Sequence, residues 1–433
     1  MKKLNSKKLF ITGALTGNVM EFFDFIIYAY LAKYIAINFF PHENQFVSKL
    51  LMFSVFASGY ITRPFGAIIF GYIGDRFGRK IALIQSIVVI TLATVCIGVL
   101  PTYAEIGLLS PILLVICRLT QGFAVSGEQS GVAVYLSESV GSDKNGFIGS
   151  LVLGSSYTGV LLGSLICLLV SSCLTEQTMR NFGWRIPFLL SIILGVGSLI
   201  FRIKGTESLE FKKARIENKL SSSPVGDTFK QQWRDMILLV MSLAVPIYMY
   251  TIYLPNYIVD IIGVGFKKSL MLSTVSLCFI SILVPAIGKF SDDIGKEKVL
   301  LIGLIASSVL GYPIFLLLSY GQPFSIVFGQ FFLGCVVSLI AAPMLGVLLN
   351  VFPIHLRYTG VSFVFNTGMA IFGSTVPVIA ISLIEFFGNK TCPGLYLSLS
   401  GIIGTLVLYI VCYKNFNLNA LTFGIMKQCN QPQ

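Results

Sequence analysis

Apolar runs long enough to cross a membrane as helices follow one another along almost the whole chain. A hydrocarbon core about 30 Å thick takes roughly 20 helical residues to cross. Only 12% of the 433 residues are charged and 55% are hydrophobic, whereas soluble domains carry about 25% charged residues. The chain is therefore too apolar for a water-soluble globule, and we predict an all-α membrane protein.

We expect twelve membrane-spanning helices, six on each side of one long polar stretch. The first six span residues 9–39, 50–72, 81–100, 107–137, 146–172 and 184–201. The second six span 236–262, 269–289, 299–319, 322–350, 358–386 and 394–413. The stretch 202–235 is polar and contains the run SSSP, so we predict a cytoplasmic linker between an N-terminal bundle (1–201) and a C-terminal bundle (236–433).

Positive charge falls on alternate sides of these helices. Twenty-one of the 31 Lys and Arg residues lie at the two ends of the chain or in every second gap between helices, and Lys289 at the edge of such a gap makes twenty-two. Cytoplasmic loops of membrane proteins carry such an excess, so both termini are expected in the cytoplasm. Because the basic residues sit in short loops and not on one face or tail, the net charge of +12 argues against a nucleic-acid partner.

A short signature occurs twice, at the same place in each predicted bundle. The segment GDRFGRK at Gly74–Lys80 returns in altered form as SDDIGKEK at Ser291–Lys298, at a constant offset of 217 residues. Both copies lie between the second and third helix of their bundle. Two parallel six-helix repeats that face each other form a cavity at the membrane midplane, which can open to either side. The duplication therefore favours a transporter over a purely structural membrane protein.

The charged residues inside predicted helices of the N-terminal bundle include Glu21, Asp24, Arg63, Arg118 and Glu128. Each costs about 2.5–3.5 kcal/mol at the centre of a membrane-spanning helix, so we expect them to face a cavity. Glu21 and Asp24 are three residues apart and share one helical face. Arg118 and Glu128 lie about 15 Å apart along their helix, so each needs a partner from another helix. The alternative is that these residues form salt bridges that hold the bundle together.

The C-terminal helices contain almost no central charge. They offer instead a tyrosine stripe in the seventh helix and Asn366 in the eleventh; the stripe consists of Tyr248, Tyr250, Tyr253 and Tyr257. Such a stripe is more often packing or an interfacial belt than a binding site. Aromatic rings that face charged residues would nevertheless suit a ligand with a substituted ammonium group, through cation–π contact.

Several motifs resemble those of a known family. GYIGDRFGRK after the second helix resembles the signature loop of the major facilitator superfamily, and RLTQGFAVSGE (Arg118–Glu128) resembles its second, arginine-bearing motif. More narrowly, four segments resemble the metabolite:proton symporters, a family that includes proline/betaine, α-ketoglutarate, citrate and shikimate carriers. These segments are GNVMEFFDF (Gly17–Phe25), RPFGAIIFG (Arg63–Gly71), GWRIPFLL (Gly183–Leu190) and NTGMAIFGSTVP (Asn366–Pro377).

The resemblance implies a cytoplasmic gate in the first signature loop. Its expected members are Gly71, Asp75, Arg76, Gly78, Arg79 and Glu138. Asp75 would engage the start of the eleventh helix near Tyr358–Gly360, where the helix dipole favours a carboxylate. Arg76 and Arg79 would contact Glu138. The second copy has Asp293 and Glu297 where the first has Arg76 and Lys80, so we expect a weaker gate there.

The resemblance also implies proton-driven symport by alternating access. Arg118 would tune a nearby carboxylate, with Glu21, Asp24 or Glu128 taking the proton. From the residues themselves we expect the substrate to contact Arg63, Tyr250, Tyr253 and Asn366. A guanidinium lowers a carboxylate pKa and burial raises it, so helix movement can toggle protonation. The family usually has Trp where this chain has Phe22. The segment Lys414–Gln433 shows no heptads, so the coiled-coil tail of osmosensing carriers is not expected.

We therefore predict a secondary transporter in the plasma (bacterial inner) membrane that carries a small organic solute with a proton. A zwitterion such as proline or betaine fits best, because the expected cavity would hold three carboxylates and two arginines; a di- or tricarboxylate is the alternative. A non-transporting sensor is a third reading, although no signalling domain is evident. We expect no enzyme, cofactor, metal or obligatory protein partner: the nine cysteines show no ligand spacing, and His42 and His355 lie far apart.

Overall fold

The computed structural model describes residues 2–40, 55, 58–217, 224–229 and 233–429, and every regular element in these ranges is a helix. The N-terminal half contains α1 (Lys2–Tyr30), α2 (Ala32–Phe39), α4 (Arg63–Arg76), α5 (Arg79–Val99), α6 (Tyr103–Ile106), α7 (Leu109–Val125), α8 (Glu128–Val140), η1 (Ser142–Lys144), α9 (Asn145–Cys173), α10 (Glu176–Thr178), η2 (Met179–Gly183) and α11 (Arg185–Lys204). Two short helices follow, α12 (Leu209–Ile216) and α13 (Pro224–Thr228).

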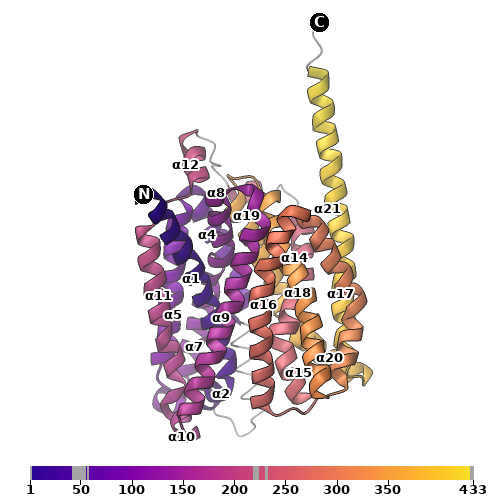
Figure 1. Cartoon of the computed structure of the whole chain (residues 1–433). Coiled ribbons are helices and arrows are strands. Elements are labelled where there is room, and N and C mark those ends of the chain that lie inside the picture. The colour runs from indigo at the N-terminus through magenta and orange to yellow at the C-terminus, as the bar shows by residue number, and fades with distance from the viewer. Residues whose placement is uncertain (1, 41–54, 56–57, 218–223, 230–232, 430–433) are drawn as a thin grey trace.

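The C-terminal half contains α14 (Trp233–Tyr248), η3 (Met249–Tyr253), α15 (Leu254–Asp260), α16 (Phe266–Ile294), α17 (Lys296–Ser319), α18 (Pro323–Val351), α19 (Arg357–Gly368), η4 (Met369–Gly373), α20 (Val376–Phe387) and α21 (Pro393–Cys429). The long helices of both halves stand side by side, and α12 lies at the same end of the molecule as both chain termini (Figure 1).

Ten spans within the described ranges are long and apolar enough to cross a membrane, and α1 with α2 makes an eleventh across a bend of 70°. The helix expected over 50–72 lies partly outside the described residues, and its described part leads into α4. Large apolar side chains such as Ile282, Val275 and Leu108 are exposed on the outer surface, where lipid would cover them. This architecture agrees with the predicted twelve-helix, all-α membrane fold.

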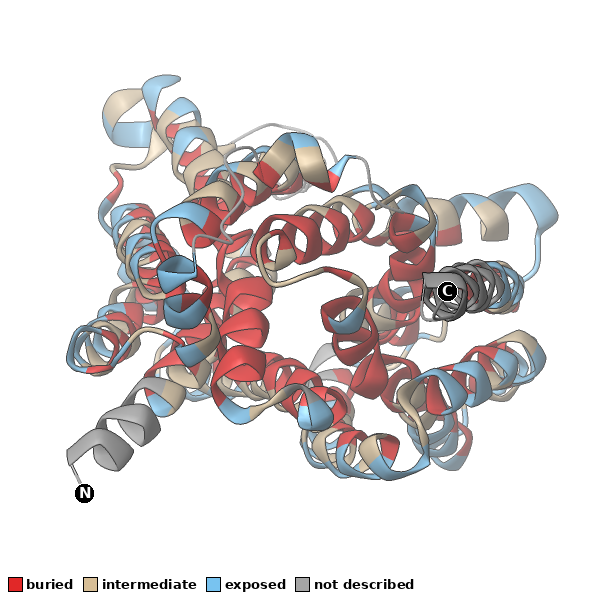
Figure 2. Cartoon of the chain, turned by 90° about the horizontal axis from the view of Figure 1, so that it is seen from above, coloured by how far each residue is buried: buried red, intermediate tan, exposed pale blue. Residues whose placement is uncertain are grey.

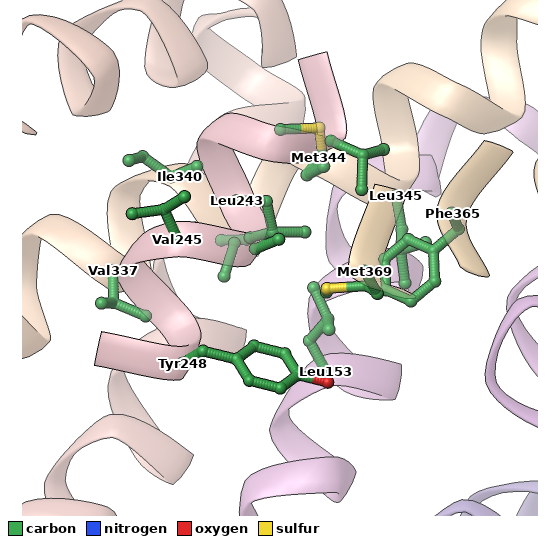
Figure 3. Close-up of a cluster of buried hydrophobic side chains, with 14 of the residues drawn as sticks. Leu153, Leu243, Val245, Tyr248, Val337, Ile340, Met344, Leu345, Phe365 and Met369 are labelled. Carbon is green, nitrogen blue, oxygen red and sulfur yellow. The ribbon is translucent and has the colours of Figure 1, made fainter. Parts of the chain in front are cut away.

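Buried residues lie on the sides of the helices that face the centre of the molecule (Figure 2). There the two halves meet: α9 packs on α16 and α18, while α4 and α8 pack on α19. The central part of the C-terminal half is apolar. Figure 3 shows side chains such as Leu243, Met344 and Phe365 packed together, with Leu153 of the N-terminal half against them.

Two helices of the C-terminal half each contain a π-helical turn. A π-turn at η3 precedes Pro255, and another at η4 precedes Pro377. Proline has no N–H to donate to the preceding turn, so the helix widens just before each proline. The tyrosines of the seventh predicted helix are therefore spread over a widened turn and do not form one straight stripe.

The sequence repeat has a structural counterpart. Gly78 and Gly295, which occupy equivalent positions in the two signature loops, have φ of 131° and 111°. Side chains other than glycine rarely adopt this backbone conformation. Each of these glycines turns the chain between consecutive helices of its half, α4 to α5 and α16 to α17.

Two helix ends differ from expectation. The sixth predicted helix was expected to end at 201, but α11 continues to Lys204 and buries Arg202 completely. The last predicted helix was expected to end at 413, but α21 continues to Cys429. In both places a polar residue ended the apolar run in the sequence without ending the helix.

Candidate functional site

A small cavity lies within the N-terminal half, where the predicted intramembrane charges meet. Its walls are formed by Glu21, Asp24, Phe25, Gly59, Arg63, Ile90, Arg118, Gln121, Gly122 and Val125. Its volume is about 20 Å³, enough for about one or two water molecules. The cavity is thus too small for an amino acid in this conformation, so a solute can enter only if the helices move.

The two carboxylates of the cavity are incompletely satisfied. Oδ2 of Asp24 accepts a hydrogen bond of 2.8 Å from Thr94, but its Oδ1 makes none with the described residues. Oε2 of Glu21 likewise makes none within the described part of the chain. Both side chains are buried. A buried polar atom without a partner costs about 1–3 kcal/mol, so each oxygen is a candidate to take a proton, water or a ligand donor.

Asp24 is connected to Arg118 through neutral side chains. Thr94, which donates to Asp24, accepts from Nε2 of Gln121 at 2.6 Å. Oε1 of Gln121 in turn accepts from Nη1 of Arg118 at 2.9 Å. The predicted proton-coupling residues Asp24 and Arg118 are thus linked by a chain of three hydrogen bonds.

Both arginines of the cavity stack on aromatic rings. The guanidinium of Arg63 lies 4.3 Å from the ring centre of Tyr60, and that of Arg118 lies 4.3 Å from the ring centre of Tyr28. Phe25 lies between them, at 5.4 Å from Arg63 and 5.9 Å from Arg118. Cation–π contacts of this kind stabilise a desolvated cation by about 2 kcal/mol. The rings therefore help to hold two positive charges beside Glu21 and Asp24.

Glu128 lies apart from this cavity and is fully paired. It forms a two-pronged ion pair with Arg202 of α11, in which Nη1 donates to Oε2 at 2.9 Å and Nη2 donates to Oε1. Ser86 donates to Oε2 at 2.7 Å. The linker predicted over 202–235 includes Arg202, so the sequence did not indicate this partner. The position of Arg202 just beyond a long apolar run was the one signal that could have shown it to be the end of a helix.

The first signature loop forms the expected contact with the other half. Asp75 accepts hydrogen bonds from the backbone N–H groups of Tyr358 (3.2 Å) and Thr359 (2.8 Å) and from the Thr359 hydroxyl (2.7 Å). It thereby caps the first turn of α19. Arg79, also completely buried, pairs with Asp75 at 3.0 Å and with Glu138 at 2.7 Å.

Arg76 does not join this network as expected. It is exposed and donates to the hydroxyl of Tyr72 at 2.7 Å. The reason is its direction: Arg76 is the last residue of α4, whereas Arg79 opens α5 after the turn at Gly78 and points inward. Glycines in and before the loop allow α19 of the other half to pack closely. A Cβ on Gly71 would lie 2.6 Å from Thr359, and one on Gly74 would lie 2.4 Å from the ring of Tyr358.

Residues of the predicted linker pack onto the network of Asp75, Arg79 and Glu138. Ser208 donates to Oε2 of Glu138 at 2.6 Å, and the ring of Phe211 covers the guanidinium of Arg79 at 4.7 Å. The carboxylate of Glu207 accepts from the backbone N–H of Lys80 at 3.1 Å, in the first turn of α5. Burial raises the pKa of Glu207 above its usual value. The polar composition of the linker gave no sign that its first residues are packed.

The second signature copy makes the corresponding contact with the N-terminal half. Asp292 accepts from the backbone N–H groups of Gly146 and Phe147, each at 2.8 Å, in the first turn of α9. Its basic neighbour is Lys296 at 3.4 Å. Each half therefore caps a helix of the other half. What distinguishes the first copy is the buried Arg79–Glu138 pair.

The structure does not bring the four predicted substrate residues together. Arg63 lies at the first cavity, while Tyr250 donates to the carbonyl of Ser276 at 2.8 Å. Tyr253 packs against Tyr257. Asn366 donates to the carbonyl of Ser126 at 2.9 Å. A second small cavity lies beside Tyr250, lined by Tyr30, Tyr250, Thr251, Leu254, Pro255, Ser273, Ser276, Leu277 and Gln330.

Two halves that cap each other's helices through a repeated aspartate, together with a buried charged cavity, define a secondary transporter and not an enzyme. The model of the Major Facilitator Superfamily matches residues 9–377, and the chain belongs to this superfamily. It is an integral, multi-pass membrane protein.

Similar proteins of known sequence cover nearly the whole chain. A Staphylococcus aureus (strain COL) protein provisionally named a proline/betaine transporter is 36% identical over 94% of this chain and 88% of its own length. The proline/betaine transporter of Escherichia coli (strain K12) is 30% identical over 91% of this chain and 81% of its own length. A glycine betaine/proline/ectoine/pipecolic acid transporter of Dickeya dadantii is 31% identical over 92% and 81%.

Among solved structures, the proton:xylose symporter bound to 6-bromo-6-deoxy-D-glucose is similar in fold. It superposes with a TM-score of 0.77 at 15% identity, over 94% of this chain and 96% of the symporter. The predicted superfamily and twelve-helix fold are thereby confirmed.

Proposed function

We propose that this protein carries a small zwitterion, such as proline or betaine, into the cell together with a proton. The observation that carries the proposal is the cavity in which Glu21 and Asp24 each keep a buried oxygen without a hydrogen-bond partner among the described residues, beside Arg63 and Arg118 on aromatic rings. The names of the relatives support the choice of solute.

The charges of the cavity complement those of a zwitterion. A solute carboxylate would bind a guanidinium, Arg63 or Arg118, through charge-assisted hydrogen bonds. The solute ammonium would lie against the faces of Phe25 and Tyr60, where the arginine now stacks. A di- or tricarboxylate fits less well, because it would bring two or three further negative charges beside Glu21 and Asp24.

Glu21 and Asp24 are the proton sites that we favour. A carboxyl group with a free lone pair in a dry cavity gains or loses a proton as nearby cations move. Glu128 was also predicted for this role, but its carboxylate is held by Arg202 and Ser86. In this account Arg118 acts through Gln121 and Thr94 to adjust the charge at Asp24.

Alternating access would come from rocking of the two halves, with the linker 202–235 between them. We propose that the end of the molecule that holds both termini and α12 faces the cytoplasm (Figure 1), in line with its excess of positive charge. Residues 202–204 belong to α11 and would move with the N-terminal half. Asp75 and Asp292 would then act as cytoplasmic latches.

The proposal is tested by uptake into proteoliposomes with and without an inward proton gradient. We expect accumulation of labelled proline that is driven by the gradient and is inhibited by betaine, but not by α-ketoglutarate or citrate. Glu21→Gln and Asp24→Asn should be measured in parallel, with exposed Glu385→Gln as control. At least one cavity variant should exchange proline across the membrane yet fail to accumulate it.

Two outcomes contradict the proposal separately. Absence of proline and betaine transport, with uptake of a dicarboxylate instead, would refute the solute. Full gradient-driven accumulation in both cavity variants would remove Glu21 and Asp24 as proton sites.

A further inference from the structure

The fourth membrane-spanning segment, Leu109–Val140, is one span whose regular α-helical pattern is interrupted at Ser126 and Gly127, although both residues keep right-handed helical backbone angles; we call this interruption the α7–α8 break. There α7 ends and α8 begins, and the N–H of Gly127 donates to the carbonyl of Ala124, three residues back, at 3.2 Å. The break is positioned by packing: a Cβ on Gly127 would lie 2.6 Å from the ring of Phe70 in α4. Glycine is therefore required at the point where the helix is interrupted.

One polar stripe of α19 docks on this break from the other half. Tyr358, Ser362 and Asn366 are spaced four residues apart, so they lie on one helical face. The Tyr358 hydroxyl donates to the carbonyl of Gly127 at 2.6 Å, and Nδ2 of Asn366 donates to the carbonyl of Ser126 at 2.9 Å. Between them the hydroxyls of Ser362 and Ser130 are 2.6 Å apart. All three stripe residues are buried.

The ring of Tyr358 packs closely against two glycines of the N-terminal half, Gly74 and Gly131. A Cβ on Gly74 would lie 2.4 Å from its ring, and a Cβ on Gly131 would lie 2.0 Å from its hydroxyl oxygen. The first turn of α19 is fixed by Asp75 at the same place. On the other side of the break, Glu128 begins α8 and is held by Arg202.

We propose that Tyr358, Ser362 and Asn366 together with the α7–α8 break form the inner gate of the transport path. The stripe closes the path between the cavity and the latch at Asp75, and it opens when α19 leaves the carbonyls of Ser126 and Gly127. Asn366 is then a gate residue, not a substrate ligand. The proposal rests on the transporter class of the protein and does not depend on which solute is carried.

The gate is tested by labelling a cysteine at the cavity from the cytoplasmic side. Val125→Cys, in a full-length chain whose native cysteines are replaced, places the thiol at the cavity wall next to the break. Inverted vesicles are treated with a membrane-impermeant maleimide. Tyr358→Phe removes one inter-half hydrogen bond and keeps the ring, so labelling should accelerate by on the order of three- to tenfold. Ser362→Ala should act in the same direction.

Tyr257→Phe is the matched control, because its hydroxyl also donates to a backbone carbonyl, that of Lys390 at 3.0 Å, but within the C-terminal half. It should label like the parent. Unchanged labelling in both Tyr358→Phe and Ser362→Ala, with both proteins folded by circular dichroism, would overturn the gate. Asn366→Ala separates the two roles of this residue. A higher KM for proline without faster labelling would show that Asn366 binds the substrate and is not part of the gate.

Failure of the solute proposal leaves this test intact, since labelling needs no substrate. A protein that transports no proline can still show faster labelling in the gate variants, which would support the gate alone.

Discussion

At the scale of single residues, the buried carboxylates of the N-terminal half differ in how fully they are hydrogen-bonded. Glu128 forms an ion pair with Arg202, and Glu138 forms one with Arg79. Glu21 and Asp24 instead keep an oxygen without a hydrogen bond to any described residue. Because removal of one partner from a buried pair is strongly unfavourable, the paired residues suit structural roles. The incompletely paired carboxylates suit a role in which a proton or a ligand binds and is released.

We expect Arg202→Met to destabilise the protein strongly. The substitution leaves the Glu128 carboxylate buried beside Ser86 without its cation, and breaking a buried pair in this way costs about 3–5 kcal/mol. The thermal unfolding midpoint of the purified protein should fall clearly, and should recover in large part in the double variant Glu128→Gln with Arg202→Met. Arg180→Met, at an exposed arginine, should change it little. Equal midpoints for the single and double variants would show that the pair is not the source of the effect.

We expect Glu207→Gln to flatten the pH dependence of stability. Burial raises the pKa of Glu207 above 4.5 in the folded protein, so between 4.5 and that higher pKa the folded state binds more protons than the unfolded state. Its contribution to stability is therefore present below pH 4.5 and is lost as pH rises through the folded pKa. The unfolding midpoint of the variant, followed from pH 4 to 8, should lack this decline.

Glu105→Gln should change the pH dependence of stability in the opposite direction. The backbone N–H of Thr102 lowers the pKa of Glu105, so this residue stabilises above pH 4.5 and its contribution is lost as pH falls through the folded pKa. A Glu207→Gln profile parallel to that of the unsubstituted protein would contradict the assignment.

At the scale of elements, one arrangement is used twice. Asp75 caps the first turn of α19, and Asp292 caps the first turn of α9, each across the interface between halves. The N-terminus of a helix favours a carboxylate through its free N–H groups and its dipole. The two caps differ in support, since Arg79 beside Asp75 is completely buried whereas Lys296 beside Asp292 is partly exposed.

We expect Asp75→Asn to slow turnover more than Asp292→Asn does. Asp75 accepts three hydrogen bonds from α19 and also faces Arg79, and a hydrogen bond to a charged group contributes about 1.5–3 kcal/mol. Turnover of proline uptake should fall about tenfold or more in Asp75→Asn and less in Asp292→Asn, with KM little changed in either. A similar loss in both variants would mean that the buried arginine adds nothing to the first latch.

Most of the helices and the two signature loops could be predicted from the sequence, because apolar length and glycine position are local properties. Asp75, Arg79 and Glu138 could be assigned from a motif, and their contacts follow. The partners Arg202 and Glu207 could not, because pairing over distances of 74 or 127 residues depends on which helices pack together. The contacts of the α19 stripe could not be predicted for the same reason. No sequence motif surrounds Ser362, and its partner Ser130 lies in the other half.

At the scale of the whole molecule, the halves share a fold but differ in chemistry. The N-terminal half contains the charged cavity, whereas the centre of the C-terminal half is filled by apolar side chains (Figure 3). The halves touch through the two aspartate caps and the α19 stripe, and also where Tyr248 donates to the hydroxyl of Tyr60 at 2.9 Å. The N-terminal half therefore supplies the charge, and the C-terminal half supplies a surface against which it moves.

The size of the cavity has a consequence for the membrane as a barrier. If the empty carrier returns through the conformation described here, its cavity of about 20 Å³ has room for only about one or two water molecules, too few for a hydrated ion to travel in. Each return of the empty protein would thus carry almost nothing across. A cell could accumulate solute to high concentration while the resting carrier neither drains the membrane voltage nor lets salt leak.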